Sequence, residues 1–192
     1  MRVIAGEYRS RQLAAPRGMS TRPTSDRLRE TLFNVLAPSI VGARFIDLYA
    51  GSGAVGIEAL SRGAEFVLFA ENAPPALRAI RENLAALKIA AGYRLEERNA
   101  MAALEAMLKR GENADLIFLD PPYQAEAEYS RILELLGSER GAALLSEGGR
   151  VIAEHSAKDQ LAEKYGSLER VRLLKQGDAA LSFYERRLPA LL

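Results

Sequence analysis

The sequence predicts an α/β protein built on a doubly wound, mostly parallel sheet whose last strand is antiparallel. Apolar runs of strand length alternate with periodic stretches of helix length, which is typical of a parallel sheet covered by helices. One run leads into a glycine-rich turn, and the last two runs are separated by too few residues for a helix. Seven strands are predicted, near residues 44–49, 65–70, 93–98, 114–119, 149–154, 170–175 and 180–185.

Helices are predicted in most of the segments between these strands. The helix over residues 25–36 begins at a cap formed by Thr24 or Ser25 and ends before Pro38. The helix over residues 74–87 begins with two prolines, which suit a first helical turn. The segment 176–179 is far too short for a crossover helix, so it predicts a hairpin before the final strand.

The length of 192 residues suits one domain with an extension. We expect residues 1–40 to form a basic extension packed on the core and residues 41–192 to form the main domain. Residues 1–30 hold seven arginines, no lysine and three acids, which leaves a charge of 7 − 3 = +4. Arginine favours bidentate recognition of phosphate, although a solvated basic arm has the same composition.

The composition excludes several classes of chemistry. The chain has no cysteine, so it has no disulfides, thiolate zinc sites or thiol nucleophiles. Its 48% hydrophobic and 27% charged residues are typical of a globular protein. Neither a signal-peptide pattern nor a run of about 18 apolar residues is present. We therefore expect a cytoplasmic protein with no membrane partner and no metal.

The segment 45–56 places a glycine-rich turn between an apolar strand and a helix, where nucleotide-like cofactors bind. Gly51 and Gly53, on either side of Ser52, can adopt positive φ and allow a ligand to approach the backbone closely. Gly56 would allow the helix to pack tightly against the sheet. This glycine spacing also fits a dinucleotide-binding enzyme, or a tight turn without a ligand.

Two acids near this turn favour a cationic cofactor that carries a ribose. Asp47 precedes the glycines, where a pyrophosphate would gain nothing from a negative charge but a sulfonium and an α-ammonium group would. Glu71 ends the next strand, twenty residues after Gly51, and is placed to accept hydrogen bonds from ribose hydroxyls. Because NAD enzymes use an acid in the same way, Glu71 indicates a ribose rather than a particular cofactor. Together the two acids favour S-adenosylmethionine.

The segment 116–123 ends an apolar strand with Asp120, Pro121, Pro122 and Tyr123. In a doubly wound sheet the fourth strand lies beside the first, so Asp120 is expected to face the glycine-rich turn. The prolines hold the backbone extended and remove two N–H donors, which leaves the Asp120 carboxylate and the Pro121 carbonyl as acceptors. The loop therefore predicts a binding site for an NH2 group.

An exocyclic amine of a base is a poor nucleophile because its lone pair is delocalised into the ring. Two acceptors would favour a pyramidal nitrogen whose lone pair points at the methyl group, and Tyr123 would stack on the base. An aspartate with a pKa of about 3.9 is too weak a base to deprotonate the amine beforehand, so the proton leaves after transfer. His155, the only histidine, is expected to be a partly exposed structural residue without a catalytic role.

These motifs resemble the bacterial family that methylates N2 of a guanine in 16S ribosomal RNA, and the likeness extends to residues 2–6, 22–34 and 177–184. The resemblance implies a seven-stranded, Rossmann-like methyltransferase sheet with a reversed last strand. It also implies that residues 22–30 line the cofactor site and that the arginine-rich arm meets RNA. In one departure, Asn99 followed by Ala100 replaces the usual acid after the third strand, although the Asn99 amide oxygen can still accept a bond from the adenine amine.

The predicted site residues follow from these motifs and the resemblance. The predicted cofactor-binding residues are Arg22, Thr24, Asp47, Gly51, Ser52, Gly53, Glu71, Asn72, Asn99, Ala100 and Asp120. The predicted catalytic residues are Asp120, Pro121, Pro122 and Tyr123. The predicted RNA-binding residues are Arg9, Arg11, Arg22 and Arg27.

The predicted partner is 16S ribosomal RNA or an assembly intermediate of the small subunit, and two other readings remain open. A DNA adenine-N6 or cytosine-N4 methyltransferase would use the same Asp-Pro-Pro-Tyr loop, but such enzymes usually carry a separate recognition domain, for which 192 residues leave little room. An NAD-dependent oxidoreductase or a non-catalytic nucleotide-binding module would leave residues 120–123 without a purpose.

Overall fold

The computed structural model describes residues 1–16, 25–122 and 126–187, which form two compact units with a boundary after Ala103. Within the described residues of the first unit, the elements run in the order α1 (Asp26–Leu36), β1 (Arg44–Leu48), α2 (Ala54–Ser61), β2 (Phe66–Ala70), α3 (Pro74–Ala86) and β3 (Tyr93–Glu96). Helix α4 (Ala100–Arg110) begins in this unit and continues across the boundary.

The strands of the first unit are parallel and lie in the order β3-β2-β1. Ile46 of β1 is opposite Leu68 of β2, which is opposite Arg94 of β3. Strands β1 and β2 are buried along almost their whole length, as expected for parallel strands covered on both faces. All three strands were predicted from the sequence.

Both helices predicted with defined ends are present. Helix α1 begins after Ser25, whose hydroxyl accepts a hydrogen bond from the Leu28 amide at 3.1 Å. Its buried apolar residues Leu28, Leu32, Phe33 and Leu36 share one face of the helix and face the core. Helix α3 begins at Pro74, as the two prolines predict. Thr24, the other candidate cap, lies outside the described residues.

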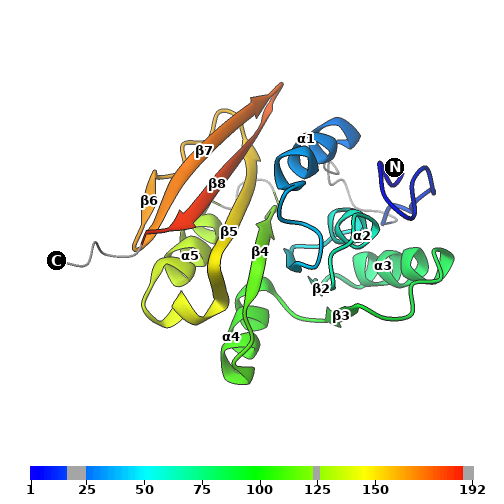
Figure 1. The fold of residues 1–192 in the computed structure, drawn as a ribbon, viewed down its shortest axis with the longest axis horizontal. Helices are drawn as coiled ribbons and strands as arrows, with labels where there is room; N and C mark the ends of the chain where they lie inside the picture. Colours follow the sequence, from blue (N-terminus) through cyan, green and yellow to red (C-terminus); the bar gives the residue numbers. More distant parts are fainter. Residues whose placement is uncertain (17–24, 123–125, 188–192) are drawn as a thin grey trace. The chain divides into compact units, whose positions relative to one another are not determined.

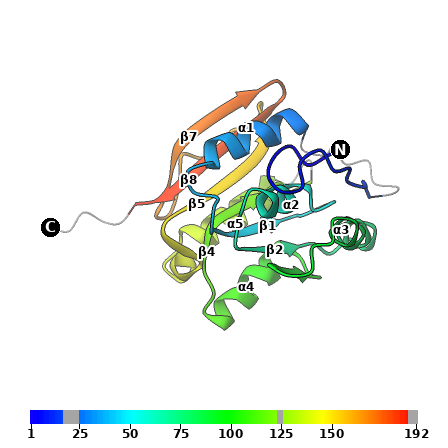
Figure 2. The same ribbon diagram turned by 45° about the vertical axis from the view of Figure 1, so that its right-hand side comes forward.

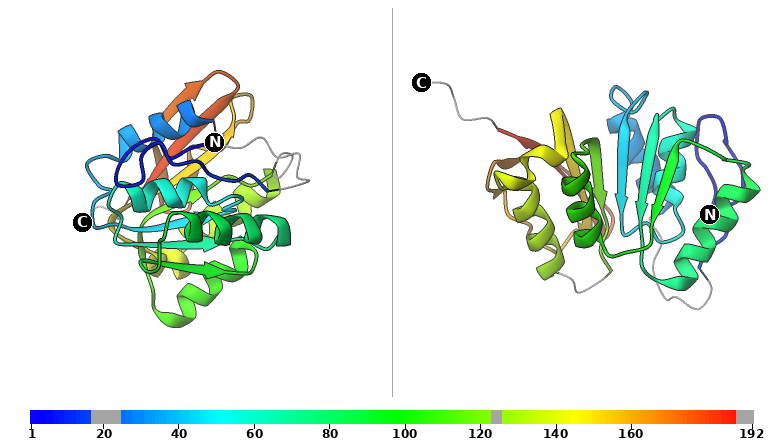
Figure 3. Two further views of the ribbon diagram at one scale, coloured as in Figure 1. Left: turned by 90° about the vertical axis from the view of Figure 1, so that its right-hand side faces the viewer. Right: turned by 90° about the horizontal axis from the view of Figure 1, so that it is seen from below.

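Residues 1–16 run over α2 and along α3 (Figures 2 and 3). The segment folds back on itself, because Arg2 and Gln12 form an antiparallel bridge and the Val3 amide donates to the Arg11 carbonyl at 3.0 Å. Residues 1–16 belong to the same compact unit as residues 41–103. The predicted boundary at residue 40 remains a prediction.

The described part of the second unit continues with β4 (Ala114–Leu119), α5 (Glu126–Gly137), the short 3₁₀ helix η1 (Arg140–Leu144), β5 (Leu145–Ser156), β6 (Lys164–Tyr165), β7 (Leu168–Gln176) and β8 (Ala179–Arg186). Its strands lie in the order β4-β5-β8-β7-β6, and the last four are seen side by side in Figure 1. Strand β4 is parallel to β5, whereas β8 is antiparallel to both β5 and β7. The predicted hairpin is confirmed, and Gly177 takes a positive φ of 61° at its turn.

The predicted fold class, a mixed α/β sheet with mostly parallel strands and an antiparallel end, is confirmed with one difference in strand number. Eight strands rather than seven occur among the described residues, and the additional strand β6 has two residues. Two residues are too few to produce an alternating pattern in the sequence. Within residues 1–16, 25–122 and 126–187, no helix is long and apolar enough to cross a membrane.

Candidate active site

The glycine-rich turn joins β1 to α2 through backbone conformations that few residues tolerate. Tyr49, Gly51 and Gly53 have positive φ values of 69°, 55° and 78°. The positive φ predicted for both glycines is confirmed. Tyr49 is a further case that sequence reasoning missed, and a left-handed conformation costs a non-glycine residue about 1–2 kcal/mol. Such a cost is often found at functional sites.

Gly56 allows α2 to approach β2 closely, as predicted. A Cβ atom at this position would lie 2.2 Å from Cε1 of Phe69, far inside van der Waals contact. Phe69 is itself completely buried in β2. The third glycine of the motif therefore serves packing, while Gly51 and Gly53 serve the conformation of the turn.

Asp47 has a structural role that the sequence did not reveal. Its side chain is 1% exposed, and Oδ2 accepts a hydrogen bond from the Gly56 amide at 2.9 Å. Gly53, the N-cap of α2, has no side chain that could cap the helix. Asp47 supplies the missing cap from β1 and places its negative charge at the positive end of α2. Its predicted contact with a cationic cofactor remains a prediction.

Glu71 joins the end of β2 to the glycine-rich turn and to the start of α3. Its Oε2 accepts from the Gly51 amide at 2.9 Å, and its Oε1 accepts from the amides of Asn72 and Ala73, both at 2.8 Å. The carboxylate therefore lies at the turn, as the spacing of twenty residues predicts. A carboxylate oxygen offers more than one lone pair, so these bonds are compatible with the predicted ribose contact.

The two positions predicted after the third strand lie at the start of α4. The Asn99 Oδ1 accepts from the Ala102 amide at 2.8 Å, so the side chain caps the first turn of the helix. Asn99 is exposed, and Ala100 is buried. The sequence predicts that this amide oxygen accepts from the ligand, and the capping bond occupies part of its capacity to accept.

Of the predicted arm residues, Arg9, Arg11 and Arg27 are exposed, and Arg22 lies outside the described residues. Arg11 donates from Nη2 to the carbonyl of Ala86 at the end of α3, at 3.3 Å. A cation at a helix C-terminus is favourable, but an exposed contact of this kind is weak. Arg11 thus contacts the C-terminal end of α3 at the protein surface.

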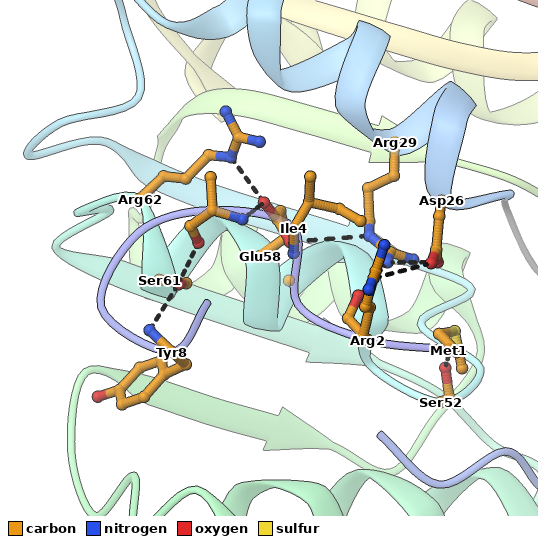
Figure 4. Close-up of polar contacts among 12 residues, drawn as sticks. Met1, Arg2, Ile4, Tyr8, Asp26, Arg29, Ser52, Glu58, Ser61 and Arg62 are labelled. Carbon is orange, nitrogen blue, oxygen red and sulfur yellow. Dashed lines mark hydrogen bonds and ion pairs between the residues drawn. The ribbon is translucent and has the colours of Figure 1, made fainter. Parts of the chain in front are cut away.

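Two buried charges, Arg29 on α1 and Glu58 on α2, hold the N-terminal segment in place (Figure 4). Glu58 is completely buried and accepts from the amides of Ile4 and Ala5 at 2.7 and 3.0 Å. Arg29, also completely buried, donates to the Arg2 carbonyl and to Asp26. The resemblance implied that residues 22–30 line the cofactor site, but the Arg29 side chain is committed to this buried network.

The Asp-Pro-Pro segment follows β4 in the second unit. Asp120 is half-buried, Pro121 is buried and Pro122 is exposed, while Tyr123 lies outside the described residues. Leu119 of β4 pairs with Ala153 of β5, so Asp120 comes directly after the paired part of the strand. Its predicted approach to the glycine-rich turn remains a prediction.

His155 lies at the end of β5 and is more buried than the sequence suggested, at 5% exposure. Its Nε2 lies 2.9 Å from the Ser182 hydroxyl and its Nδ1 lies 2.8 Å from the Ser156 carbonyl. Because a carbonyl only accepts, Nδ1 carries the proton and Nε2 accepts from Ser182. The expectation of partial exposure was wrong, because the ring is buried against Tyr129 of α5 and Ser182 of β8.

We expect the free energy of unfolding to fall as the pH is lowered from about 7 to about 5.5, through His155. Burial lowers the pKa of His155 below its ordinary value of 6.5. As the pH falls, the unfolded chain therefore takes up the proton before the folded protein does. The stabilisation that neutral His155 gives the fold is complete above about pH 6.5 and decreases as the pH falls below it. Urea titrations should show a smaller loss for His155→Gln, which cannot titrate. Equal losses in both proteins would contradict the prediction.

Comparison with known proteins gives the family. Residues 1–185 match the model of the family described as conserved hypothetical protein 95. A Bacillus subtilis (strain 168) protein, provisionally named rRNA methyltransferase YlbH, is 38% identical over 187 residues, or 97% of this chain and 100% of that protein. Ribosomal RNA small subunit methyltransferase D of Escherichia coli (strain K12) is 44% identical over 124 residues, or 65% of this chain and 61% of that protein.

Solved structures agree with this assignment. An Escherichia coli protein described provisionally as methyltransferase yhhF has a TM-score of 0.83 to this chain, with 32% sequence identity and 98% of both chains covered. Because the family model spans residues 1–185 and YlbH matches almost the entire chain, this protein belongs to the conserved hypothetical protein 95 family.

Proposed function

We propose that this protein transfers a methyl group from S-adenosylmethionine to the exocyclic N2 amine of a guanine in 16S ribosomal RNA. The methyltransferase names of its relatives support the reaction class, and the small-subunit name of one relative supports the choice of RNA. The observation that carries the proposal is the glycine-rich turn held at positive φ between Asp47 and Glu71. The same chain carries an Asp-Pro-Pro-Tyr segment after β4.

The turn in the first unit suits the predicted cofactor. A Cβ atom at Gly53 would lie 3.2 Å from Cγ1 of Ile80, and a residue with a side chain would be strained at this positive φ. Glycine therefore leaves the backbone of the turn accessible to a ligand. Glu71 accepts hydrogen bonds from the ribose hydroxyls of the cofactor. Asp47 provides a negative charge near the turn that favours the cationic cofactor. When bound, S-adenosylmethionine supplies a methyl group already activated on a sulfonium.

The Asp-Pro-Pro segment of the second unit binds the substrate amine. The Asp120 carboxylate and the Pro121 carbonyl accept the two amine protons and direct the nitrogen lone pair toward the methyl group. The developing positive charge on nitrogen is stabilised by the carboxylate, and the proton leaves after the bond has formed. Tyr123 stacks on the guanine and fixes the plane of the ring.

The test is a transfer of labelled methyl to 16S RNA and to partly assembled small subunits, followed by mass spectrometry of the modified nucleosides. We expect N2-methylguanosine at a single position. Duplex DNA serves as the competing substrate, and label in N6-methyladenine or N4-methylcytosine would replace the proposal by a DNA methyltransferase. Calorimetry that shows tight binding of NAD and none of S-adenosylhomocysteine would overturn the cofactor assignment.

Replacing Arg9 and Arg11 together by alanine should weaken RNA binding and flatten its salt dependence, because each arginine is expected to displace counterions from a phosphate. The slope of log K against log salt should decrease in magnitude by about 1.4 if both contact single-stranded phosphates. Cofactor affinity should be unchanged. Arg131→Ala, an exposed arginine paired with Glu128 on α5, is the matched control. If the double variant has the same slope as the unmodified protein, Arg9 and Arg11 do not contact RNA phosphates and the arm is only a solvated basic segment.

A further inference from the structure

Asn83 on α3 contacts both the glycine-rich turn and the N-terminal segment. It is 2% exposed. Its Nδ2 donates to the Ser52 carbonyl at 2.9 Å and to the Ala14 carbonyl at 3.1 Å, while its Oδ1 accepts from the Ala14 amide at 2.7 Å. One side chain therefore joins three segments that are 31 and 69 residues apart in the sequence.

These contacts allow a single orientation of the amide. Both Nδ2 hydrogens are directed to carbonyl oxygens, which only accept, and Oδ1 faces an N–H, which only donates. Rotating the amide by half a turn would place two oxygens against Oδ1 and a donor against Nδ2. In a buried position such mismatches are costly, because water cannot replace the lost partners. Asn83 is thus a specific connector rather than a space-filling residue.

The contact with Ser52 also bears on where α2 begins. In a regular helix the Ser52 carbonyl would accept from the Gly56 amide four residues later. Here the Gly56 amide donates to Asp47, and the Ser52 carbonyl accepts from Asn83 instead. Asp47 thus takes the donor and Asn83 takes the acceptor of the hydrogen bond that would extend α2 into the turn. The helix consequently starts at Ala54, after Gly53 in its left-handed conformation.

We infer that Asn83 is a positioning residue that keeps the glycine-rich turn open for the cofactor and couples the turn to Ala14 of the N-terminal segment. The inference rests on the proposed function, since it takes this turn as the site of S-adenosylmethionine. The N-terminal segment contributes to cofactor binding in this way, because Ala14 and Ser52 are both hydrogen-bonded to the side-chain amide of Asn83. By thermodynamic linkage, a ligand that stabilises the turn also stabilises the attachment of Ala14.

The first test measures this coupling in the unmodified, full-length protein. S-adenosylhomocysteine should slow hydrogen exchange of the Ala14 amide by a larger factor than that of the Val3 amide, which donates to Arg11 away from Asn83. Comparing the two amides removes the general slowing that any ligand produces by stabilising the folded state. Equal slowing of both amides would overturn the coupling, without any need for a variant.

The second test uses variants of α3 and calorimetry with S-adenosylhomocysteine. Asn83→Ala removes all three bonds, and Asn83→Asp keeps the bond from the Ala14 amide but turns an oxygen toward two carbonyls. Both should raise the dissociation constant by about tenfold or more and abolish the selective slowing at Ala14. Glu82→Ala, at the exposed neighbouring position, is the control and should match the unmodified protein.

The outcomes separate the inference from the proposed function. If the unmodified protein fails to bind S-adenosylhomocysteine, the cofactor assignment fails and the inference fails with it. If the unmodified protein binds it and the folded Asn83 variants bind it equally well, the inference alone is wrong. If both variants fail to fold, the comparison of Ala14 with Val3 in the unmodified protein decides the question.

Discussion

Asp120→Ala is expected to lose methyl transfer by about two to three orders of magnitude, which is the usual loss when one preorganised partner is removed at a reacting centre. Without the carboxylate, the amine lone pair is no longer directed at the methyl group, and the positive charge on nitrogen is not stabilised. The residue is half-buried at the end of β4, so the fold should survive the change. RNA binding should be retained. Single-turnover assays with saturating cofactor and RNA measure the chemical step directly.

Two further variants make the Asp120 experiment specific. Asp120→Asn keeps one oxygen that can accept from the amine but removes the negative charge, so its rate should lie between those of the unmodified protein and Asp120→Ala. Glu163→Ala removes a carboxylate that is 88% exposed in the same unit and should transfer methyl at the unmodified rate. If Asp120→Ala also transfers methyl at that rate, the catalytic assignment must be withdrawn.

Glu58→Ala is expected to reduce the free energy of unfolding by about 3–5 kcal/mol, the typical cost of removing one partner of a buried ion pair. Glu58 and Arg29 are both completely buried, and Oε2 of Glu58 lies 3.8 Å from Nε of Arg29 (Figure 4). Without Glu58, Arg29 keeps its ion pair with the half-exposed Asp26, and the amides of Ile4 and Ala5 lose their acceptor. Urea unfolding followed by circular dichroism gives the comparison.

The controls for Glu58 separate charge from hydrogen bonding. Glu58→Gln keeps an acceptor for only one of the two N-terminal amides and loses the charge, so we expect an intermediate loss of stability. Glu65→Ala, an exposed glutamate in the same unit, should stay within about 0.5 kcal/mol of the unmodified protein. A Glu58→Ala protein as stable as the Glu65→Ala protein would show that the network contributes little.

The main elements of the fold could be predicted from local patterns. Strands β1 and β2 are buried apolar runs, and their periodicity is visible in any window of the sequence. Helix α3 begins where Pro74 predicts, and the Gly177 turn joins β7 to β8 as its length predicts. The two-residue strand β6 was missed because its formation depends on pairing with β7 rather than on its own sequence.

The geometry of the glycine-rich turn could be predicted from the sequence, whereas the side chains that support it could not. Gly51, Gly53 and Glu71 were identified because glycines and an acid at fixed spacings after buried strands form a local motif. The same reasoning assigned Asp47 and Asn99 to the ligand alone, which stays a prediction, whereas the structure shows that both side chains cap helices. A carboxylate or an amide can serve a ligand and a helix end at the same time, and the sequence pattern is the same in both cases.

The sequence by itself determined the α/β class, the glycine-rich turn, the Asp-Pro-Pro-Tyr segment and the arginine-rich start of the chain. Only the tertiary structure decided what Glu58, Arg29 and Asn83 do. Apart from the local pairs Arg29–Asp26 and Glu58–Arg62, their partners lie between 27 and 69 residues away along the chain, as in the Arg29–Arg2 and Asn83–Ala14 contacts. A buried polar side chain on a helix looks in the sequence like one that faces solvent. Its role depends on which distant backbone groups folding brings within hydrogen-bonding distance, and no local pattern records that distance.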